Sequence, residues 1–276
     1  MSSTKPVNKT SLPDIKKIIL VASGKGGVGK STVAAGLALS LAKEGYAVGL
    51  LDADIFGPSV PTLFNLSNAG RPAGIEKNGK TMLQPYEQFG VKIMSIGFFV
   101  EPSQAVIWRG PMVTNVLRQL LTETDWDTLD YLIIDTPPGT GDIHITLMQE
   151  FFVAGAIVVT TPQKIALDDV HRAIDMLTDD KIGAPVLGIV ENMAWFSPIK
   201  HPDEKYFLFG QGGGELLSKE YKLPLLAQIP INETISENCD AGKVQAILND
   251  TAIYEAFQTL ATNVINQKKS FRFIQQ

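Results

Sequence analysis

The sequence predicts an α/β fold, a single-domain, doubly wound and mostly parallel sheet flanked by helices. Its most apolar short runs are largely continuous rather than alternating, as in strands that helices cover on both faces. Helix-like stretches lie between many of these runs, and such alternation predicts a parallel sheet with right-handed crossovers. The expected strands are Ile18–Ala22, Val48–Leu51, Val91–Ile96, Tyr131–Ile134, Ala156–Thr160, Val186–Val190 and Leu225–Ile229. The expected helices are Ser31–Glu44, Val113–Glu123, Ile143–Phe152, Leu167–Leu177, Gly214–Tyr221 and Ala252–Gln267.

Length and composition are consistent with one soluble domain. The 276 residues show no internal repeat and divide into a flexible lead (1–14), the folded domain (15–268) and a tail (269–276). Residues 66–90 and 195–211 break the strand–helix rhythm and are expected to form functional loops.

Charge and cysteine content exclude several classes of protein. The net charge of −5 does not favour nucleic-acid binding. No apolar run approaches the roughly 20 residues that cross a bilayer, and no secretory signal is recognisable, so we expect no membrane partner. Cys239 is the single cysteine, which excludes an intrachain disulfide and a Cys-rich zinc site. A reducing, cytoplasmic location suits this composition.

A glycine-rich segment after the first expected strand carries the strongest functional signal. It satisfies G-x-x-x-x-G-K-[ST], with a strand before it and an Ala/Leu-rich helix after it. Glycines let backbone N–H groups converge on phosphates, and the helix N-terminus adds positive charge. The expected phosphate-binding residues are Gly24, Gly26, Gly27, Val28, Gly29, Lys30, Ser31 and Thr32. We therefore predict a P-loop for ATP in which Lys30 neutralises the β- and γ-phosphates, Ser31 binds Mg²⁺ and Thr32 reaches the α-phosphate.

Acidic residues at two strand ends complete the predicted site. Asp135 follows the strand Tyr131–Ile134 and is placed to hold Mg²⁺ through water, while the Gly139 N–H is placed to sense the γ-phosphate. Asp52 and Asp54 follow the strand Val48–Leu51. A capping or turn role is the alternative for each aspartate.

Lys25, early in the phosphate loop, marks the deviant form of this motif. The chain here resembles the class that contains MinD, ParA and the nitrogenase iron protein. The resemblance implies a homodimer in which Lys25 reaches the partner's nucleotide and acts on the transferring phosphoryl group. It also implies that Asp54 orients the attacking water, that Asp52 lies near Mg²⁺ and that Asn192 reads the nucleobase. Solvated or turn positions are the alternatives for these residues.

Longer stretches resemble a narrower family, the Mrp/ApbC iron–sulfur cluster carrier ATPases. The resemblance covers about residues 15–265. It is carried by LLDADIFGPS (50–59), WRGPM (108–112), DTPPGTGD (135–142), TTPQKIALDD (160–169), ENMAWF (191–196) and FGQGGG (209–214).

The chain departs from this family at its cargo site. Members usually carry Cys-x-x-Cys after the Asn-Met-aromatic segment, where this chain has Ser197-Pro198-Ile199-Lys200. In the family each subunit supplies two thiolates to a cluster that bridges the dimer, and this chain cannot repeat that arrangement. Cys239 is better explained as a packed side chain. His201, Asp203 and Glu204 offer harder ligands, but a polar exposed loop explains them more simply.

The resemblance predicts an ATP-binding and hydrolysing homodimer of the iron–sulfur cluster carrier or assembly type, with client or scaffold proteins as partners. A MinD- or ParA-like positioning switch is the first alternative. The C-terminal tail is only weakly amphipathic and the net charge is negative, so the sequence has no feature that favours membrane or DNA binding by such a switch. The second alternative is a cluster-free adaptor ATPase within the same family.

Overall fold

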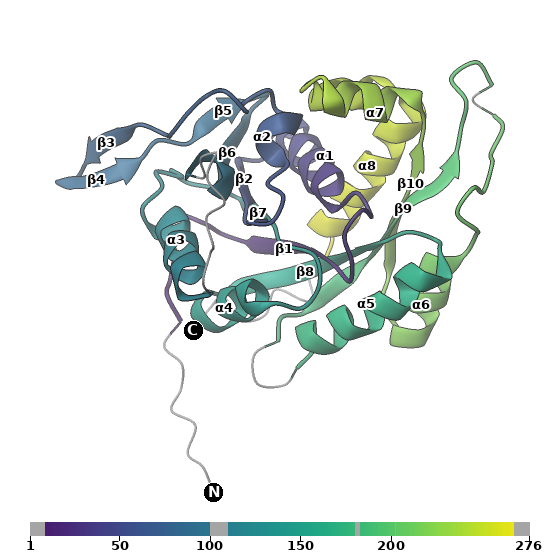
Figure 1. Cartoon of the computed structure of the whole chain (residues 1–276), viewed down its shortest axis with the longest axis horizontal. Coiled ribbons are helices and arrows are strands. Elements are labelled where there is room, and N and C mark those ends of the chain that lie inside the picture. The colour runs from purple at the N-terminus through teal and green to yellow at the C-terminus, as the bar shows by residue number, and fades with distance from the viewer. Residues whose placement is uncertain (1–8, 100–109, 180–182, 202, 268–276) are drawn as a thin grey trace, which may run out of the picture.

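A computed structural model describes residues 9–99, 110–179, 183–201 and 203–267 and contains an eight-stranded sheet (Figure 1). The strand order is β10-β9-β8-β1-β7-β2-β6-β5, and every neighbouring pair is parallel except β5 with β6. The strands are β1 (Ile18–Ser23), β2 (Val48–Asp52), β5 (Tyr86–Gln88), β6 (Val91–Ser95), β7 (Tyr131–Asp135), β8 (Val153–Thr160), β9 (Val186–Phe196) and β10 (Leu225–Ile231). The predicted fold class is confirmed.

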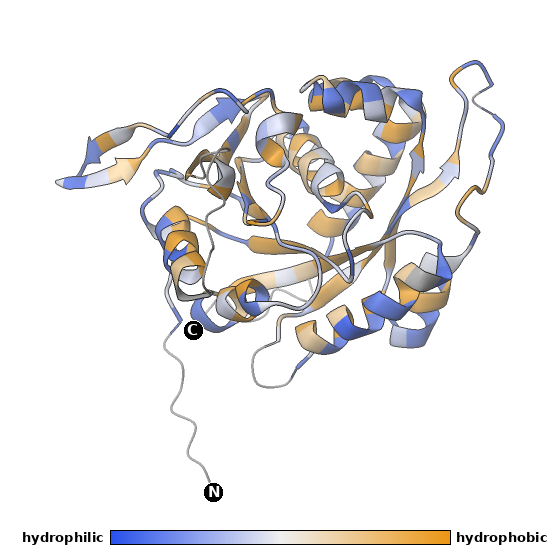
Figure 2. Cartoon of the chain, viewed as in Figure 1, coloured by the Kyte–Doolittle hydropathy of each residue, from blue (hydrophilic) through white to orange (hydrophobic). Residues whose placement is uncertain are grey.

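Helices cover both faces of this sheet, which explains why its central strands are apolar throughout. Figure 1 shows α1 and α8 on one face and α3, α4, α5 and α6 on the other. Apolar residues concentrate on the strands and the inward helix faces, and polar residues face outward (Figure 2). The helices are α1 (Lys30–Lys43), α2 (Val60–Leu63), α3 (Gly110–Thr122), α4 (Asp142–Glu150), α5 (Lys164–Leu177), α6 (Gly213–Tyr221), α7 (Glu233–Asp240) and α8 (Thr251–Ile265), with 3₁₀ turns at Ile96–Phe99 and Val244–Asn249.

The strand ends differ from the predicted ones in ways that matter for the site. Strands β2 and β7 run one residue further, so that Asp52 and Asp135 are paired in register on neighbouring strands. Strand β9 continues to Phe196, which places Asn192 inside the strand rather than after it. Because parallel strands end at one edge of the sheet, these polar residues meet there.

The irregular segments contain more regular structure than their sequence indicates. Residues 66–90 form the hairpin of β3 (Gly74–Lys77) and β4 (Lys80–Leu83), followed by β5. Residues 195–211 are closed at their base by an antiparallel bridge between Phe196 and Tyr206. The described part of the lead is tied to the domain, because the Thr10 N–H donates to the Glu150 carbonyl at 2.6 Å.

No helix within the described ranges is long and apolar enough to cross a membrane.

Candidate nucleotide-binding site

The phosphate loop joins the buried strand β1 to helix α1. Gly27 and Gly29 have φ angles of 80° and 76°, in the left-handed region that favours glycine, and Gly29 caps the N-terminus of α1. At Gly24 a Cβ atom would lie 2.3 Å from the backbone carbonyl of Asp169 in α5. Glycine is therefore required at Gly24 by the close approach of a neighbouring helix, and it is favoured at Gly27 and Gly29 by backbone conformation.

The loop surrounds a hollow of about 320 Å³. Its lining residues are Ser23, Lys25, Gly26, Gly27, Val28, Gly29, Lys30, Ser31, Thr32, Asp54, Gly57, Ser59, Leu63 and Pro138. The predicted phosphate-binding residues other than Gly24 thus line one concavity, at the N-terminus of α1 where helix geometry favours anions.

Lys30 provides the buried positive charge of this hollow. Its side chain is 6% exposed, and its ammonium forms an ion pair with Asp135 Oδ1 and lies 3.9 Å from Asp54 Oδ2. A buried ammonium needs such partners because the interior solvates charge poorly. The Lys30 ammonium is therefore held by Asp135 at the hollow that the phosphate loop lines.

Asp135 combines features of a magnesium ligand. It is fully buried at the end of β7, and its Oδ2 makes no hydrogen bond to any described residue. Burial raises the pKa of Asp135, while the charge of Lys30 lowers it. The Ser31 hydroxyl also lines the hollow, and Ser59 Oγ donates to it at 3.4 Å. Mg²⁺ prefers one or two such oxygen ligands together with water and substrate phosphates, so these residues fit the ion.

Asp52 has a different environment from the one that we expected of a magnesium ligand. Its Oδ1 accepts the Asp54 N–H at 3.0 Å, and its Oδ2 accepts the Val60 N–H at 3.1 Å and the Ser95 hydroxyl at 3.0 Å. Burial, followed by the charge of Asp135, raises the pKa of Asp52 to about 7. Because both oxygens already accept hydrogen bonds, Asp52 holds the segment after β2 in place.

Asp54 lines the hollow. It is 8% exposed, and its Oδ1 accepts the Phe56 N–H at 3.1 Å while its Oδ2 points toward Lys30. A carboxylate that lines the phosphate hollow and stays partly accessible can orient a water molecule there.

The Gly139 N–H already donates a hydrogen bond, whereas the Lys25 ammonium has no ion-pair partner among the described residues. The Gly139 N–H donates to the Ser23 carbonyl at 2.8 Å, so sensing a γ-phosphate would require this bond to open. Lys25 is half-buried at the rim of the hollow and forms no ion pair with any described residue. Its charge therefore remains available to a phosphate.

Asn192 contacts the phosphate loop itself. Its side chain is buried, and its Nδ2 donates to the Val28 carbonyl at 2.8 Å. A Cβ atom at Gly29 would lie 2.2 Å from this Nδ2. The next residue, Met193, has a φ of 56°, which is uncommon for a residue other than glycine and often marks functional sites. Asn192 thus links β9 to the nucleotide-binding loop.

Sequence reasoning missed two residues that shape the site. Ser59 contacts Ser31, and Ser95 contacts Asp52, but isolated serines carry no recognisable pattern.

His144 is fully buried near Lys30. Burial, followed by the charge of Lys30, lowers its pKa to about 4, so the imidazole is neutral at physiological pH.

Residues 197–201, where the resemblance led us to expect a cysteine pair, belong to a structured loop. Ser197 is buried, its N–H donates to the Ile231 carbonyl at 3.1 Å, and its hydroxyl donates to the Glu204 carbonyl at 3.2 Å. His201 Nδ1 lies 3.8 Å from Glu204. Among the described residues, no group of three or more His, Cys, Asp or Glu side chains is arranged to hold a metal ion. Cys239 lies elsewhere, in α7, where burial raises the pKa of its thiol.

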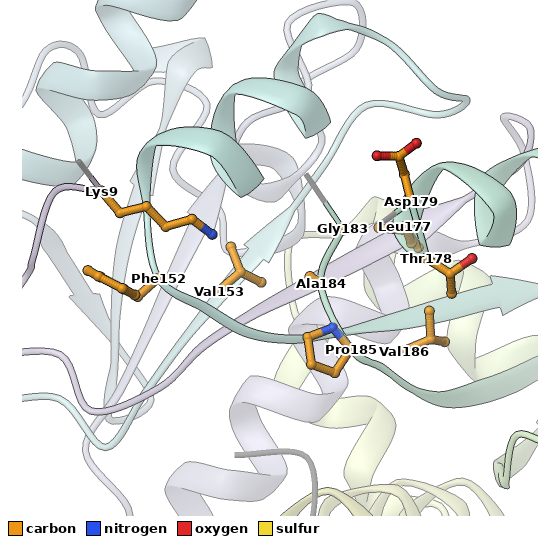
Figure 3. A pocket seen from close by; sticks show the side chains of 10 residues that line it. All are labelled: Lys9, Phe152, Val153, Leu177, Thr178, Asp179, Gly183, Ala184, Pro185 and Val186. Carbon is orange, nitrogen blue, oxygen red and sulfur yellow. The ribbon is translucent and has the colours of Figure 1, made fainter. Parts of the chain in front are cut away.

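A second hollow, of about 420 Å³, lies at the opposite edge of the sheet, where β8 and β9 begin (Figure 3). Phe152, Val153, Pro185 and Val186 line it together with Lys9. It has no glycine-rich loop and is not part of the nucleotide site.

The site's geometry defines the class of this protein, because a glycine-rich loop at a helix N-terminus presents a buried lysine to strand-end carboxylates on a parallel sheet. This is a P-loop nucleotide-binding protein. A family model described as ParA, the NUBPL iron-transfer P-loop NTPase, matches residues 14–265, and the chain belongs to this family. The predicted family is confirmed.

Relatives with similar sequences carry a consistent name. An iron–sulfur cluster carrier protein of Synechocystis sp. is 49% identical over 235 residues, covering 85% of this chain and 66% of the relative. One from Pseudomonas fragi is 47% identical over 253 residues, covering 91% of this chain and 85% of the relative. The chain thus spans slightly less than two thirds of the Synechocystis relative.

Solved structures agree on the fold. A nucleotide-binding protein from Archaeoglobus fulgidus in complex with ADP is 39% identical, with a TM-score of 0.73 over 89% of this chain and 93% of that one. The cell division ATPase MinD of Pyrococcus furiosus has a TM-score of 0.62 at 20% identity, over 91% of this chain and 98% of that one. At that identity the likeness to MinD concerns the fold alone.

Proposed function

We propose that this protein binds and hydrolyses MgATP as a homodimer and acts in the transfer or assembly of iron–sulfur clusters. The observation that carries the ATPase proposal is the buried Lys30 ammonium, which faces Asp135 and Asp54 inside the glycine-rich loop. The ADP bound to the Archaeoglobus fulgidus relative supports a nucleotide ligand.

Each residue of the hollow has a task in this proposal. Lys30 turns from Asp135 to the β- and γ-phosphates, which releases the Asp135 carboxylate toward Mg²⁺. Ser31 and Asp135 are the residues that would hold the ion, which would neutralise phosphate charge. Thr32 contacts the α-phosphate, Asp54 orients the attacking water, and the backbone N–H groups of the loop bind the remaining phosphate oxygens.

Three further residues control the nucleotide in this proposal. Lys25 reaches the phosphates bound by the second subunit and stabilises charge that develops during transfer. Asn192 contacts adenine, since an amide offers a donor and an acceptor together. The Gly139 N–H leaves the Ser23 carbonyl to contact the γ-phosphate. Asp52 supports the reaction by holding the segment that carries Asp54.

Two variants test the ATPase proposal. Lys30→Ala should lose nucleotide binding, because no other described side chain offers a buried ammonium to the β- and γ-phosphates. Lys25→Ala should keep nucleotide binding and lose turnover, because its ammonium acts on the partner's nucleotide. Binding is measured by titration with a fluorescent ADP analogue, and turnover by phosphate release. Normal turnover in Lys25→Ala would rule out the trans-lysine mechanism.

The iron–sulfur role rests on the family and on the names of the relatives, and the cluster is cargo rather than a resident cofactor. Thiolates are the usual protein ligands of such clusters, and residues 197–200 contain none. We therefore propose that client or scaffold proteins supply the cluster ligands and that this chain supplies the ATP-driven step. Anaerobic reconstitution with iron and sulfide should leave the isolated chain without a stoichiometric cluster. A stoichiometric cluster measured by absorbance and metal counting would contradict this division of roles.

A further inference from the structure

Two serine hydroxyls from separate segments of the chain meet in the nucleotide hollow. Ser31 lies in the first turn of α1, and Ser59 directly precedes α2. The two helices contact each other (Figure 1). Both serines line the hollow, and their Oγ atoms lie 3.4 Å apart. Only Ser31 has a task in the nucleotide binding proposed above, so the contact leaves the Ser59 hydroxyl to be explained.

The segment that carries Ser59 is held by buried groups on both sides. The next residue, Val60, donates its N–H to Asp52 Oδ2 at 3.1 Å, and Asp52 is fully buried at the end of β2. On the other side, Pro58 packs closely on the turn after β6, because a Cβ atom at Gly97 would lie 2.8 Å from Pro58 Cβ. Ser59 therefore reaches the hollow from a fixed position.

The Ser59 hydroxyl is not used to cap the helix that follows it. A serine directly before a helix usually accepts a backbone N–H of the first turn with its side chain. Among the described residues, no such side-chain bond forms at the start of α2. The hydroxyl donates instead to the Gly57 carbonyl at 2.9 Å, a shorter distance than the 3.4 Å to Ser31. Because a hydroxyl has one proton and two lone pairs, donation to Gly57 leaves the lone pairs free for a cation.

The separation of the two hydroxyls suits neighbouring ligands of a magnesium ion. Mg²⁺ takes octahedral oxygen ligands at about 2.0–2.1 Å, so adjacent ligand oxygens lie about 3 Å apart. The Ser31 and Ser59 oxygens, at 3.4 Å, need only a small shift to reach this spacing. The contact joins the phosphate loop to the segment after β2, which also carries Asp54 at the edge of the same hollow.

We propose that Ser59 is a second hydroxyl ligand of the magnesium ion and that it ties the segment after β2 to the bound MgATP. This inference rests on the proposed function, because it assigns a further ligand within the same site. Asp54 belongs to the segment that Ser59 fixes, so ligation of Ser59 also sets the position of the carboxylate that orients water. Loss of the Ser59 hydroxyl then weakens binding of the ion far more than binding of the nucleotide alone.

Titration of the full chain with a fluorescent, non-hydrolysable ATP analogue tests the inference, first in EDTA and then at rising Mg²⁺ concentrations. Affinity of the wild-type chain should increase with Mg²⁺. Ser59→Ala should raise the Mg²⁺ concentration of half-maximal effect about tenfold, the lower end of the loss expected at a metal site, and change the affinity in EDTA less than about twofold. Ser67→Ala is the matched control and should titrate like the wild type, because the Ser67 hydroxyl is exposed and contacts the Thr62 hydroxyl at 3.2 Å.

A second substitution tests whether Ser59 contacts the ion directly. Sulfur ligands prefer soft ions, whereas oxygen ligands suit Mg²⁺. Ser59→Cys should therefore weaken the effect of Mg²⁺ and shift the preference toward Cd²⁺ by about tenfold relative to the wild type. Ser67→Cys should leave the preference unchanged. The native Cys239 is present in every variant, so its own affinity for Cd²⁺ does not affect the comparison.

The outcomes separate this inference from the function on which it rests. If Ser59→Ala responds to Mg²⁺ as the wild type does, or Ser59→Cys keeps the wild-type metal preference, the ligand assignment is wrong while the MgATP proposal stands. If the affinity of Ser59→Ala in EDTA falls as far as its affinity with Mg²⁺, Ser59 supports the loop rather than the ion, which also overturns the assignment. If wild-type binding does not respond to Mg²⁺, the ion of the proposed function and its Ser59 ligand both fail.

Discussion

His144 should make the stability of this protein fall in mild acid, and the effect can be isolated with one substitution. The imidazole is fully buried in α4, and neither ring nitrogen has a hydrogen-bond partner among the described residues. Burial, followed by the charge of Lys30, lowers its pKa from 6.5 to about 4. Leucine has a similar volume and no charge, so His144→Leu removes the titration while it fills the same space.

The sign and size of the effect follow from proton linkage. Between pH 6.5 and 4 the unfolded chain binds a proton at this histidine that the folded chain does not, so folding weakens as the pH falls. The stabilisation is present above pH 6.5 and is lost progressively as the pH falls toward 4. A pKa lowered by this much changes the free energy of unfolding by about 3 kcal/mol over the whole titration. Between pH 7.5 and pH 5 the change is about 2 kcal/mol.

Urea unfolding followed by circular dichroism at pH 7.5 and pH 5 measures this difference. The wild-type chain should lose about 2 kcal/mol more unfolding free energy over that interval than His144→Leu does. His201→Leu is the matched control, since the His201 side chain is 67% exposed, and it should keep the wild-type pH dependence. Parallel pH dependence in the wild type and His144→Leu would refute the reasoning.

Further substitutions test the packing around the site. Gly24→Ala should abolish nucleotide binding and lower the thermal midpoint, because its Cβ would lie 2.3 Å from the backbone of α5. Gly27→Ala should cost only about 1 kcal/mol for its positive φ, because no atom lies within 4 Å of the added Cβ. Glu191 is buried and accepts hydrogen bonds from the Gly214 N–H at 2.7 Å and Gln228 Nε2 at 2.6 Å. Glu191→Ala should therefore lower the unfolding free energy by about 2–4 kcal/mol, and Glu191→Gln by less than half as much, as measured by urea unfolding.

The parts of the site that the sequence by itself determined are those encoded in adjacent residues. The phosphate loop is one continuous segment, and Gly26, Gly27, Gly29, Lys30 and Ser31 line one hollow because one strand–loop–helix unit positions them all. Asp135 was predictable for a related reason, since a carboxylate that directly follows a buried parallel strand must lie at the sheet's carboxyl edge. The continuous apolar runs likewise predicted the strands, because helices cover both faces of the sheet.

Only the tertiary structure decided what each polar side chain contacts across the fold. Asn192 donates to Val28, which lies 164 residues away in the chain, and Ser95 donates to Asp52 across 43 residues. The burial of His144 beside Lys30 and the pairing of Asp52 with Asp135 depend in the same way on the order of the strands. The hydrophobic pattern of a segment predicts whether that segment forms a helix or a strand. Contacts between polar groups far apart in the chain depend instead on strand order and helix packing. For this reason the sequence predicted a phosphate cradle, and the fold determined how its charges are paired and which surfaces surround it.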